Sequence, residues 1–290
     1  MNIVFSYDCE GLWAFIDWKK APLHPYTPDD LHNSYKNLLN LHLKYNIPAT
    51  FAFVGLYALP EKQRTAFVKE KLQDLHERLP NLFANGGLWE GHQNLQLITA
   101  EAKKNDLIEV GSHSLTHAPI ITLNDSQQKR EFKLSKEILD RLTGLNTESY
   151  IYARNLFEDG PACLTSYNKF RDTPAVKTSQ RVIDLIRTVS GMDILKSDCM
   201  SDFIFWKGGH RRHFSDRGWK KLWLTRMKEA KNKKAHSRTI HVWSHPHNLL
   251  TDAQVRDRLE WLMRLFDENR EHLNFTTMSN MLPEPKSKNV

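Results

Sequence analysis

Short apolar runs alternate along the chain with longer segments in which apolar residues recur at helical spacing. The apolar runs predict strands at residues 3–7, 48–55, 107–111, 150–153, 192–195, 239–243 and 274–278. The helical spacing predicts helices at about residues 27–45, 61–79, 126–143, 179–189, 219–227 and 252–266. A strand, a helix and a further strand in succession favour parallel pairing, so the pattern predicts an α/β fold.

Polar residues able to do chemistry follow four of these predicted strands. They are Asp8, Glu10, His113, His117, Arg154 and His245. In α/β barrels the carboxyl ends of the strands form the active site. We therefore expect these residues, far apart in the sequence, to meet in one site.

Two of the four groups have the spacing of metal ligands. His113 and His117 are four positions apart just beyond a strand, so both imidazoles can face one divalent cation. A polar loop over a barrel end is the alternative, because 14 histidines make such a pair common by chance. Asp8 and Glu10 point to one side if the strand continues through them, and carboxylates there are costly unless paired or bound to metal. A pair that caps a loop is the alternative for these acids.

The order of the motifs resembles that of the polysaccharide deacetylase family, the NodB-type carbohydrate esterases. The first motif of that family, a strand end with an aspartate, corresponds to residues 6–11 (SYDCEG), and its His-Ser/Thr-x-x-His motif is matched in full by residues 113–117 (HSLTH). Its arginine motif corresponds to residues 153–155 and its late histidine motif to residues 243–246. The resemblance runs from residue 3 to about residue 250 and is closest to cytoplasmic members from surface-polysaccharide clusters.

The resemblance implies a fold, a domain organisation and a set of metal ligands. It implies an α/β fold of the irregular (β/α)7-type, NodB-like barrel, with one catalytic domain over residues 1–282 and a flexible tail at 283–290. Glu10, His113 and His117 would hold a divalent cation, with Zn²⁺ as the preferred ion, and would leave coordination positions open. The family usually has two adjacent aspartates where this chain has Asp8-Cys9-Glu10, so a Cys9 thiolate is the alternative ligand to Glu10.

The resemblance also implies roles in metal-assisted hydrolysis of an acetamide. Asp8 would accept the proton of the attacking water, and Arg154 near it would keep it ionised. A plain surface ion pair is the alternative for Arg154. His245 would protonate the leaving amine, with His241 and His247 as competing candidates. The aspartate that the family uses to tune this histidine has three candidates: Asp193, Asp198 and Asp202.

Composition and charge restrict the class of protein and its partners. With 290 residues, 40% of them hydrophobic, the chain is not globally disordered, and three cysteines at no metal-like spacing argue against a disulfide framework. An N-terminus that predicts a strand, and no apolar stretch of ~20 residues, lead us to expect a cytoplasmic protein without a membrane span. The net charge of +7 includes the basic segment at 207–217, which suggests a uronate or phosphate on the substrate or peripheral contact with anionic lipid. We find no nucleic-acid module.

The expected function is that of a metal-dependent N-deacetylase. The substrate would be an acetamido sugar in a surface polysaccharide, such as lipopolysaccharide or capsule, or in its nucleotide- or lipid-linked precursor. Hydrolysis of another C–N bond, in a formyl group or a cyclic amide, is one alternative. A non-catalytic carbohydrate-binding protein is another, and the oligomeric state is open. Trp13, Trp89 and Trp206 are candidates for the floor of a sugar cleft, with core packing as the alternative.

Overall fold

The computed structural model describes residues 1–155, 169–171, 197–199, 204–207, 210–213, 216–231, 239–251 and 253–281. The predicted helix at 179–189, the predicted strand at 192–195 and the predicted tail lie outside these residues. The boundary of a single domain at residue 282 stays a prediction.

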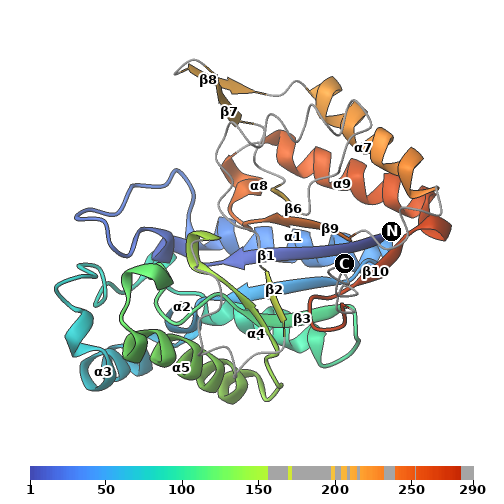
Figure 1. Ribbon diagram of the computed structural model, residues 1–290. Coiled ribbons are helices and arrows are strands. Elements are labelled where there is room, and N and C mark those ends of the chain that lie inside the picture. The colour runs from blue at the N-terminus through green and yellow to red at the C-terminus, as the bar shows by residue number, and fades with distance from the viewer. Residues whose placement is uncertain are drawn as a thin grey trace, which may run out of the picture.

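A curled sheet of parallel strands forms the centre of the molecule (Figure 1). Its strands lie in the order β5 (Lys169–Arg171), β4 (Ser149–Ile151), β3 (Ile108–Ser112), β2 (Ala49–Phe53), β1 (Asn2–Cys9), β9 (Thr239–Ser244) and β6 (Ser197–Cys199), and β10 (Asn274–Thr276) also pairs with β1. All of these pairs are parallel. A separate antiparallel pair contains β7 (Ile204–Lys207) and β8 (His210–His213).

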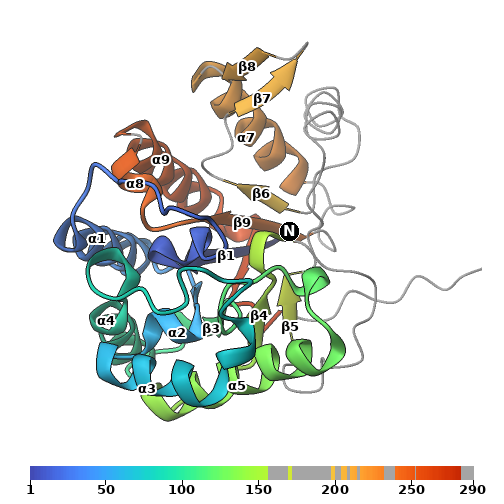
Figure 2. The same cartoon turned by 90° about the vertical axis from the view of Figure 1, so that its left-hand side faces the viewer.

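Helices cover the outside of this sheet (Figure 2). They are α1 (Pro28–Tyr45), α2 (Gly55–Ala58), α3 (Glu61–Lys71), α4 (His92–Ala102), α5 (Asp125–Thr143), α7 (Asp216–Ala230), α8 (Asn248–Thr251) and α9 (Ala253–Glu268). The irregular (β/α) barrel expected from the sequence is confirmed as a half-barrel of parallel strands with helices outside it. Among the described residues, none of the helices combines the length and the hydropathy that crossing a bilayer requires.

The sequence explains where the two best-defined helices begin and end. Before α5, the Asn124 side chain accepts from the Gln127 backbone and the Gln127 side chain accepts from the Asn124 backbone, which satisfies two free N–H groups of the first turn. Gly144 ends this helix in the left-handed conformation, at φ 68°. Thr27 and Asp30 form the same reciprocal pair before α1. By contrast, the helix predicted at 61–79 ends at Lys71, and a 3-10 turn at Gln73–Leu75 follows it.

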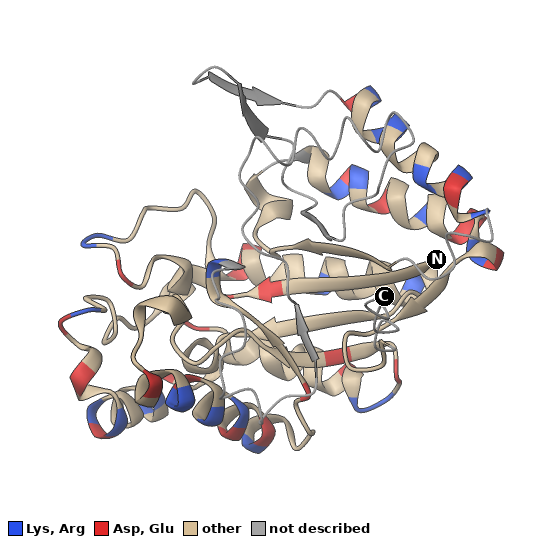
Figure 3. Ribbon diagram, in the orientation of Figure 1, with Lys and Arg blue, Asp and Glu red and all other residues tan. Residues whose placement is uncertain are grey.

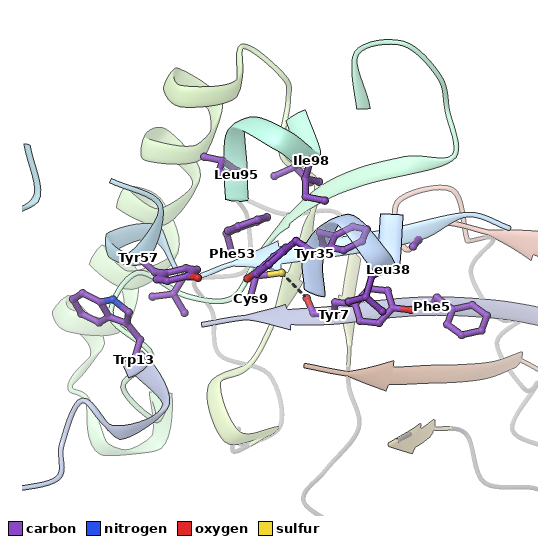
Figure 4. Close-up of a cluster of buried hydrophobic side chains, with 14 of the residues drawn as sticks. Phe5, Tyr7, Cys9, Trp13, Tyr35, Leu38, Phe53, Tyr57, Leu95 and Ile98 are labelled. Atoms are coloured by element: carbon purple, nitrogen blue, oxygen red, sulfur yellow. Dashed lines mark hydrogen bonds between the residues drawn. The ribbon is translucent and has the colours of Figure 1, made fainter. Parts of the chain in front are cut away.

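The two faces of β1 have different environments, and this difference positions the site. Phe5, Tyr7 and Cys9 point into the hydrophobic core beneath the helices (Figure 4). On the other face, Val4 packs in a small cluster with Ala52, Ile151 and Met278 inside the curl of the sheet. Asp8 has the same parity as Val4 and therefore lies on this inner face. Charged residues are concentrated on the helices, and the coloured strands carry few of them apart from the acids near the end of β1 and on β3 (Figure 3).

Candidate active site

Strand register brings the ends of four strands to nearly the same level. Cys9 of β1 is opposite Phe53 of β2, Phe53 is opposite Ser112 of β3, and Tyr7 of β1 is opposite Ser244 of β9. The next residues after three of these strands are Glu10, His113 and His245. Parallel pairing without a slip therefore delivers three candidate side chains to one edge of the sheet.

Glu10, His113 and His117 form a compact group of possible metal ligands. Oε2 of Glu10 lies 2.7 Å from Nε2 of His117 and 3.1 Å from Nε2 of His113. The two Nε2 atoms are 3.2 Å apart, and all three side chains are buried. Among the described residues, this is the group of three that could hold a metal ion. A carboxylate with two imidazoles is a donor set that Zn²⁺ accepts.

The hydrogen bond on the far side of His113 shows why this group suits a cation. Nδ1 of His113 lies 3.0 Å from the carbonyl oxygen of Ile151, which can only accept, so Nδ1 carries the proton. In the neutral ring, Nε2 then presents a lone pair toward the Glu10 carboxylate. Such lone pairs repel one another at about 3 Å unless a cation lies between them. The residues present therefore fit a bound divalent cation.

His117 reaches the group from an irregular backbone. Its φ is 63°, and its N–H donates to Oγ of Ser114 at 2.9 Å. Its buried Nδ1 has no hydrogen-bond partner among the described residues. Burial lowers the pKa of His117, although Glu10 acts against this effect, so the neutral ring that can ligate a metal is favoured.

Asp8 and His245 lie against the same group. Oδ2 of Asp8 is 3.8 Å from Nε2 of His113 and 3.9 Å from Nε2 of His245. Nε2 of His245 is 3.2 Å from Oε1 of Glu10. Burial raises the pKa of Glu10, but the neighbouring imidazoles of His117, His245 and His113 outweigh this effect and hold it well below its usual value. The site therefore keeps an ionised carboxylate at its centre.

Asn248, which the sequence interpretation missed, orients His245. Its Oδ1 lies 3.2 Å from Nδ1 of His245 and accepts from the His245 backbone N–H at 2.9 Å. Because an amide oxygen only accepts, Nδ1 carries a proton and Nε2 is turned toward Glu10. Burial lowers the pKa of His245, but Glu10 and then Asp8 raise it overall to about 9. The only feature of the sequence that could have indicated this role is the position of Asn248, three residues after His245 and at the start of α8.

Of the competing histidines, His247 contacts the His245 ring at a centroid distance of 4.8 Å, whereas His241 lies inside the sheet. Nε2 of His241 forms a hydrogen bond with Oγ of Ser6, at 2.9 Å. The ring of His247 stacks parallel to Tyr26. Among the aspartates considered for tuning His245, Asp193 and Asp202 lie outside the described residues, and Asp198 is placed only by its backbone, opposite Val242.

Arg154 is paired with Asp17, whereas we expected it to act on Asp8. One guanidinium nitrogen lies 3.0 Å from Oδ2 of Asp17, the other contacts Oδ1, and the latter also donates to the carbonyl of Ala14 at 3.1 Å. Partial burial raises the pKa of Asp17, but the bonds from Arg154 lower it overall. Arg154 thus ties the segment after β1 to the end of β4. Nothing in the local sequence around Asp17 marks it as this partner.

The alternative of a Cys9 thiolate ligand is wrong for a geometric reason. Successive side chains of a strand point to opposite faces, so Cys9 points away from Asp8 and Glu10. Its Sγ lies in the core, 3.4 Å from the carbonyl oxygen of Tyr7 (Figure 4). Burial raises the pKa of this thiol well above its usual value. The thiol is free and protonated.

Two of the tryptophans considered for a sugar cleft belong to the core. Trp13 is fully buried and donates from Nε1 to the carbonyl of Trp89, whose own ring is largely buried. The side chain of Trp206 and the glycine pair at 208–209 of the basic segment lie outside the described residues.

Comparisons with known proteins agree with this architecture. A family model described as polysaccharide deacetylase matches residues 25–162, which include His113, His117 and Arg154. A putative polysaccharide deacetylase from Mycobacterium smegmatis has a similar structure, with a TM-score of 0.54 at 12% identity, over 98% of this chain and 94% of that chain. No curated protein matches this chain in sequence.

Two further structures are more distant. The Xyl-CE4 domain of a multidomain xylanase from the hindgut metagenome of Trinervitermes trinervoides has a TM-score of 0.46 at 9% identity, over 99% of this chain and 95% of that chain. A CE4 family pseudoenzyme from Bacillus anthracis has a TM-score of 0.43 at 14% identity, over 95% of this chain and 62% of that chain. Residues 25–162 of the chain therefore match the polysaccharide deacetylase family, and the mycobacterial structure shares the fold.

Proposed function

We propose that the protein is a metal-dependent N-deacetylase that hydrolyses the acetamido group of an amino sugar. The observation that carries this proposal is the convergence of Glu10, His113 and His117, whose ligand atoms all lie within 4.8 Å of one another. The match of residues 25–162 to the family supports the reaction class, and the donor set supports Zn²⁺ as the ion.

The proposed mechanism assigns one task to each buried group. A divalent cation held by the three ligands would supply Lewis-acid chemistry, polarising the amide carbonyl and making water a better nucleophile. Oδ2 of Asp8 accepts the proton of the attacking water. Nε2 of His245, which faces Glu10 at 3.2 Å, donates a proton to the leaving amine.

The arrangement of Asp8 and His245 supports a division between base and acid. Asp8 is held within 4 Å of both His113 and His245 but does not belong to the group of three ligands. Asn248 holds Nδ1 of His245, so that Nε2 faces the centre of the site. A proton acceptor and a proton donor next to one centre are what hydrolysis of an amide requires.

We further propose a lipid-linked precursor of a surface polysaccharide as the substrate, handled on the cytoplasmic side of a membrane. The segment after the 3-10 turn at Gly11–Phe15 exposes Trp18 by 49% and Leu23 by 95%, with two exposed lysines, Lys19 and Lys20, between them. Exposed apolar side chains beside lysines are suited to the boundary of an anionic bilayer. This segment begins six residues after Glu10, and its Asp17 pairs with Arg154 after β4, so we expect a substrate presented at a bilayer to reach the site from this side.

Acetate release from N-acetylated sugars in nucleotide-linked, lipid-linked and oligosaccharide form tests the proposal. We expect a chelator to abolish release and added Zn²⁺ to restore it. Turnover that persists after complete metal removal would contradict the proposed mechanism. Release of formate, or ring opening of a cyclic amide, would favour the other C–N hydrolases. Sugar binding without any turnover would favour the non-catalytic protein.

Binding to vesicles separates the forms of the substrate. We expect the protein to co-sediment with vesicles that contain anionic lipid, and the double variant Trp18→Ser, Leu23→Ser to lose this binding while it keeps turnover of a water-soluble substrate. If the wild-type protein does not bind such vesicles, the nucleotide-linked precursor is the favoured substrate.

A further inference from the structure

The backbone between His113 and His117 is irregular. Ser114 has φ 70° and His117 has φ 63°, both in the left-handed region that residues with a side chain seldom adopt. A conformation of this kind persists only where surrounding contacts hold it in place. The groups that hold this loop therefore decide how its two imidazoles are presented.

Glu131 of α5 lies behind the loop and binds it at three points. Oε2 of Glu131 accepts from the backbone N–H of Leu115 at 2.9 Å and from that of Thr116 at 3.0 Å. Oε1 accepts from the hydroxyl of Thr116 at 2.7 Å. Two successive backbone N–H groups that face one anion form a concave anion-binding arrangement. Glu131 is 1% exposed, so water does not compete for these bonds.

The opposite side of the loop is held by α2. The N–H of Gly55 donates to the carbonyl of Ser114 at 2.9 Å, and the N–H of Leu56 donates to the carbonyl of Leu115 at 3.0 Å. A Cβ at Gly55 would lie 3.3 Å from the Leu115 side chain and 3.4 Å from Cα of Ser135, so the loop packs closely between α2 and α5. The carbonyls of the loop are thus fixed by α2 and its N–H groups by Glu131.

We propose that Glu131 is a positioning residue that sets the affinity of the site for its divalent cation. It touches neither His113 nor His117 but fixes the two residues in the middle of the loop that joins them. This inference rests on the proposed function, because it assumes that both imidazoles ligate a metal. Residues that orient metal ligands from behind typically change metal affinity or activity by about 10- to 100-fold when they are replaced.

The chemistry of the three contacts favours a carboxylate at this position. All three neighbours are donors, and an ionised carboxylate only accepts, so each contact is matched. A glutamine would keep one acceptor oxygen but turn an amide NH₂ toward donors. The substitution Glu131→Gln therefore disturbs the loop while changing the side-chain volume little.

Glu109 provides a matched control within the chain. Like Glu131, it is a carboxylate that accepts three hydrogen bonds from the protein, and it is partly buried on β3. Its donors are the hydroxyls of Thr50, at 2.6 Å, and Ser149, and the backbone N–H of Ser279, at 3.2 Å. It lies at the other end of β3 from His113. Glu109→Gln therefore makes the same chemical change away from the site.

The test measures metal binding by the full chain in competition with a chromogenic chelator, and stability by urea unfolding of the metal-free protein. We expect Glu131→Gln to weaken Zn²⁺ binding by about 10- to 100-fold and to alter the visible spectrum of bound Co²⁺. We expect Glu109→Gln to lower the unfolding midpoint but to leave the Zn²⁺ dissociation constant within about two-fold of wild type. Thr116→Val removes only the hydroxyl contact and should weaken binding less than Glu131→Gln, which keeps the test usable if the latter does not fold.

Two results would overturn the inference. One is wild-type Zn²⁺ affinity and an unchanged Co²⁺ spectrum in Glu131→Gln, or in Thr116→Val if only that variant folds. The other is an equal loss of affinity in Glu109→Gln. If the wild-type chain binds no divalent cation, the proposed function fails together with this inference. If wild type is active with Zn²⁺ and the Glu131 variant binds it equally well, only this inference fails.

Discussion

His245 and Glu10 meet across the edge of the sheet, with Nε2 of the histidine 3.2 Å from Oε1 of the acid. The two residues follow β9 and β1, neighbouring strands whose parallel register brings them to one level. The other carboxylate oxygen of Glu10 faces His113 and His117. Glu10 is therefore the residue through which the proposed acid and the proposed metal site are connected.

Glu10→Gln should weaken metal binding, whereas Cys9→Ala, a change at the neighbouring residue, should not. Removing the negative charge removes the only carboxylate of the ligand group, so we expect Zn²⁺ binding to weaken by at least about 100-fold, more than for the residues that only orient ligands. Cys9→Ala is the control, because its thiol lies in the core. Equilibrium dialysis of both variants measures the effect. A strong loss of Zn²⁺ binding in Cys9→Ala would show that the Cys9 thiolate is a metal ligand after all.

Asp8→Asn should separate catalysis from metal binding. An asparagine of nearly the same shape cannot accept the proton of the attacking water, so we expect kcat to fall by about 10²- to 10⁴-fold. The Zn²⁺ dissociation constant should stay close to that of wild type, since Asp8 is not one of the three ligands. Steady-state acetate release and metal titration test both parts. Loss of the metal would instead make Asp8 a ligand.

Asn248→Ala should release His245 from its orientation. Without the amide oxygen, Nδ1 loses its acceptor and the ring can rotate, so we expect kcat to fall by about ten-fold or more with little change in KM. Asn248→Asp retains an acceptor at the same place and should recover most of the activity. Equal losses in both variants, or a rise in KM alone, would contradict this role.

Arg154 and Asp17 should behave as a pair. Their side chains are 30% and 32% exposed, so we expect a coupling of about 1 kcal/mol or less in a double-mutant cycle of urea unfolding with Arg154→Gln and Asp17→Asn. We also expect the two single variants to change acetate release to a similar degree. A large loss of kcat in Arg154→Gln alone would support the role on Asp8 that the sequence suggested.

His42 should make stability depend on pH in mildly acidic solution. It is buried between the Tyr7 hydroxyl, at 2.7 Å, and the Ile47 carbonyl, at 2.8 Å, and burial lowers its pKa to about 4. Between about pH 6.5 and pH 4 the unfolded chain binds a proton that the folded chain does not, so stability falls as the pH falls. This residue contributes at most about 1.4 kcal/mol per pH unit.

The matched variant His42→Gln removes the titrating group. Urea unfolding at several pH values should give a shallower loss of stability in the variant than in wild type across this window. Identical slopes would show that His42 has the same pKa in the folded and the unfolded chain, which contradicts the lowered value.

The sequence by itself determined β1, β2, β3, β4, β9 and β10, most helices and the types of residue that follow the strand ends. Local periodicity reflects burial along each element, so β1, α5 and the residues at the strand ends could be predicted. The His-x-x-x-His spacing and the alternation along β1 also predicted that His113 and His117 would act together and that Asp8 and Glu10 would share a face. These features depend on neighbours within a few positions of one another.

Only the tertiary structure decided which distant groups support the site. Arg154 pairs with Asp17, 137 positions away, and Glu131 holds a loop that belongs to another element. Asn248 orients His245 through a turn whose geometry depends on packing after β9. Such contacts are set by the register of the sheet and by how helices pack on it, and hydrophobic periodicity along one segment carries no information about either.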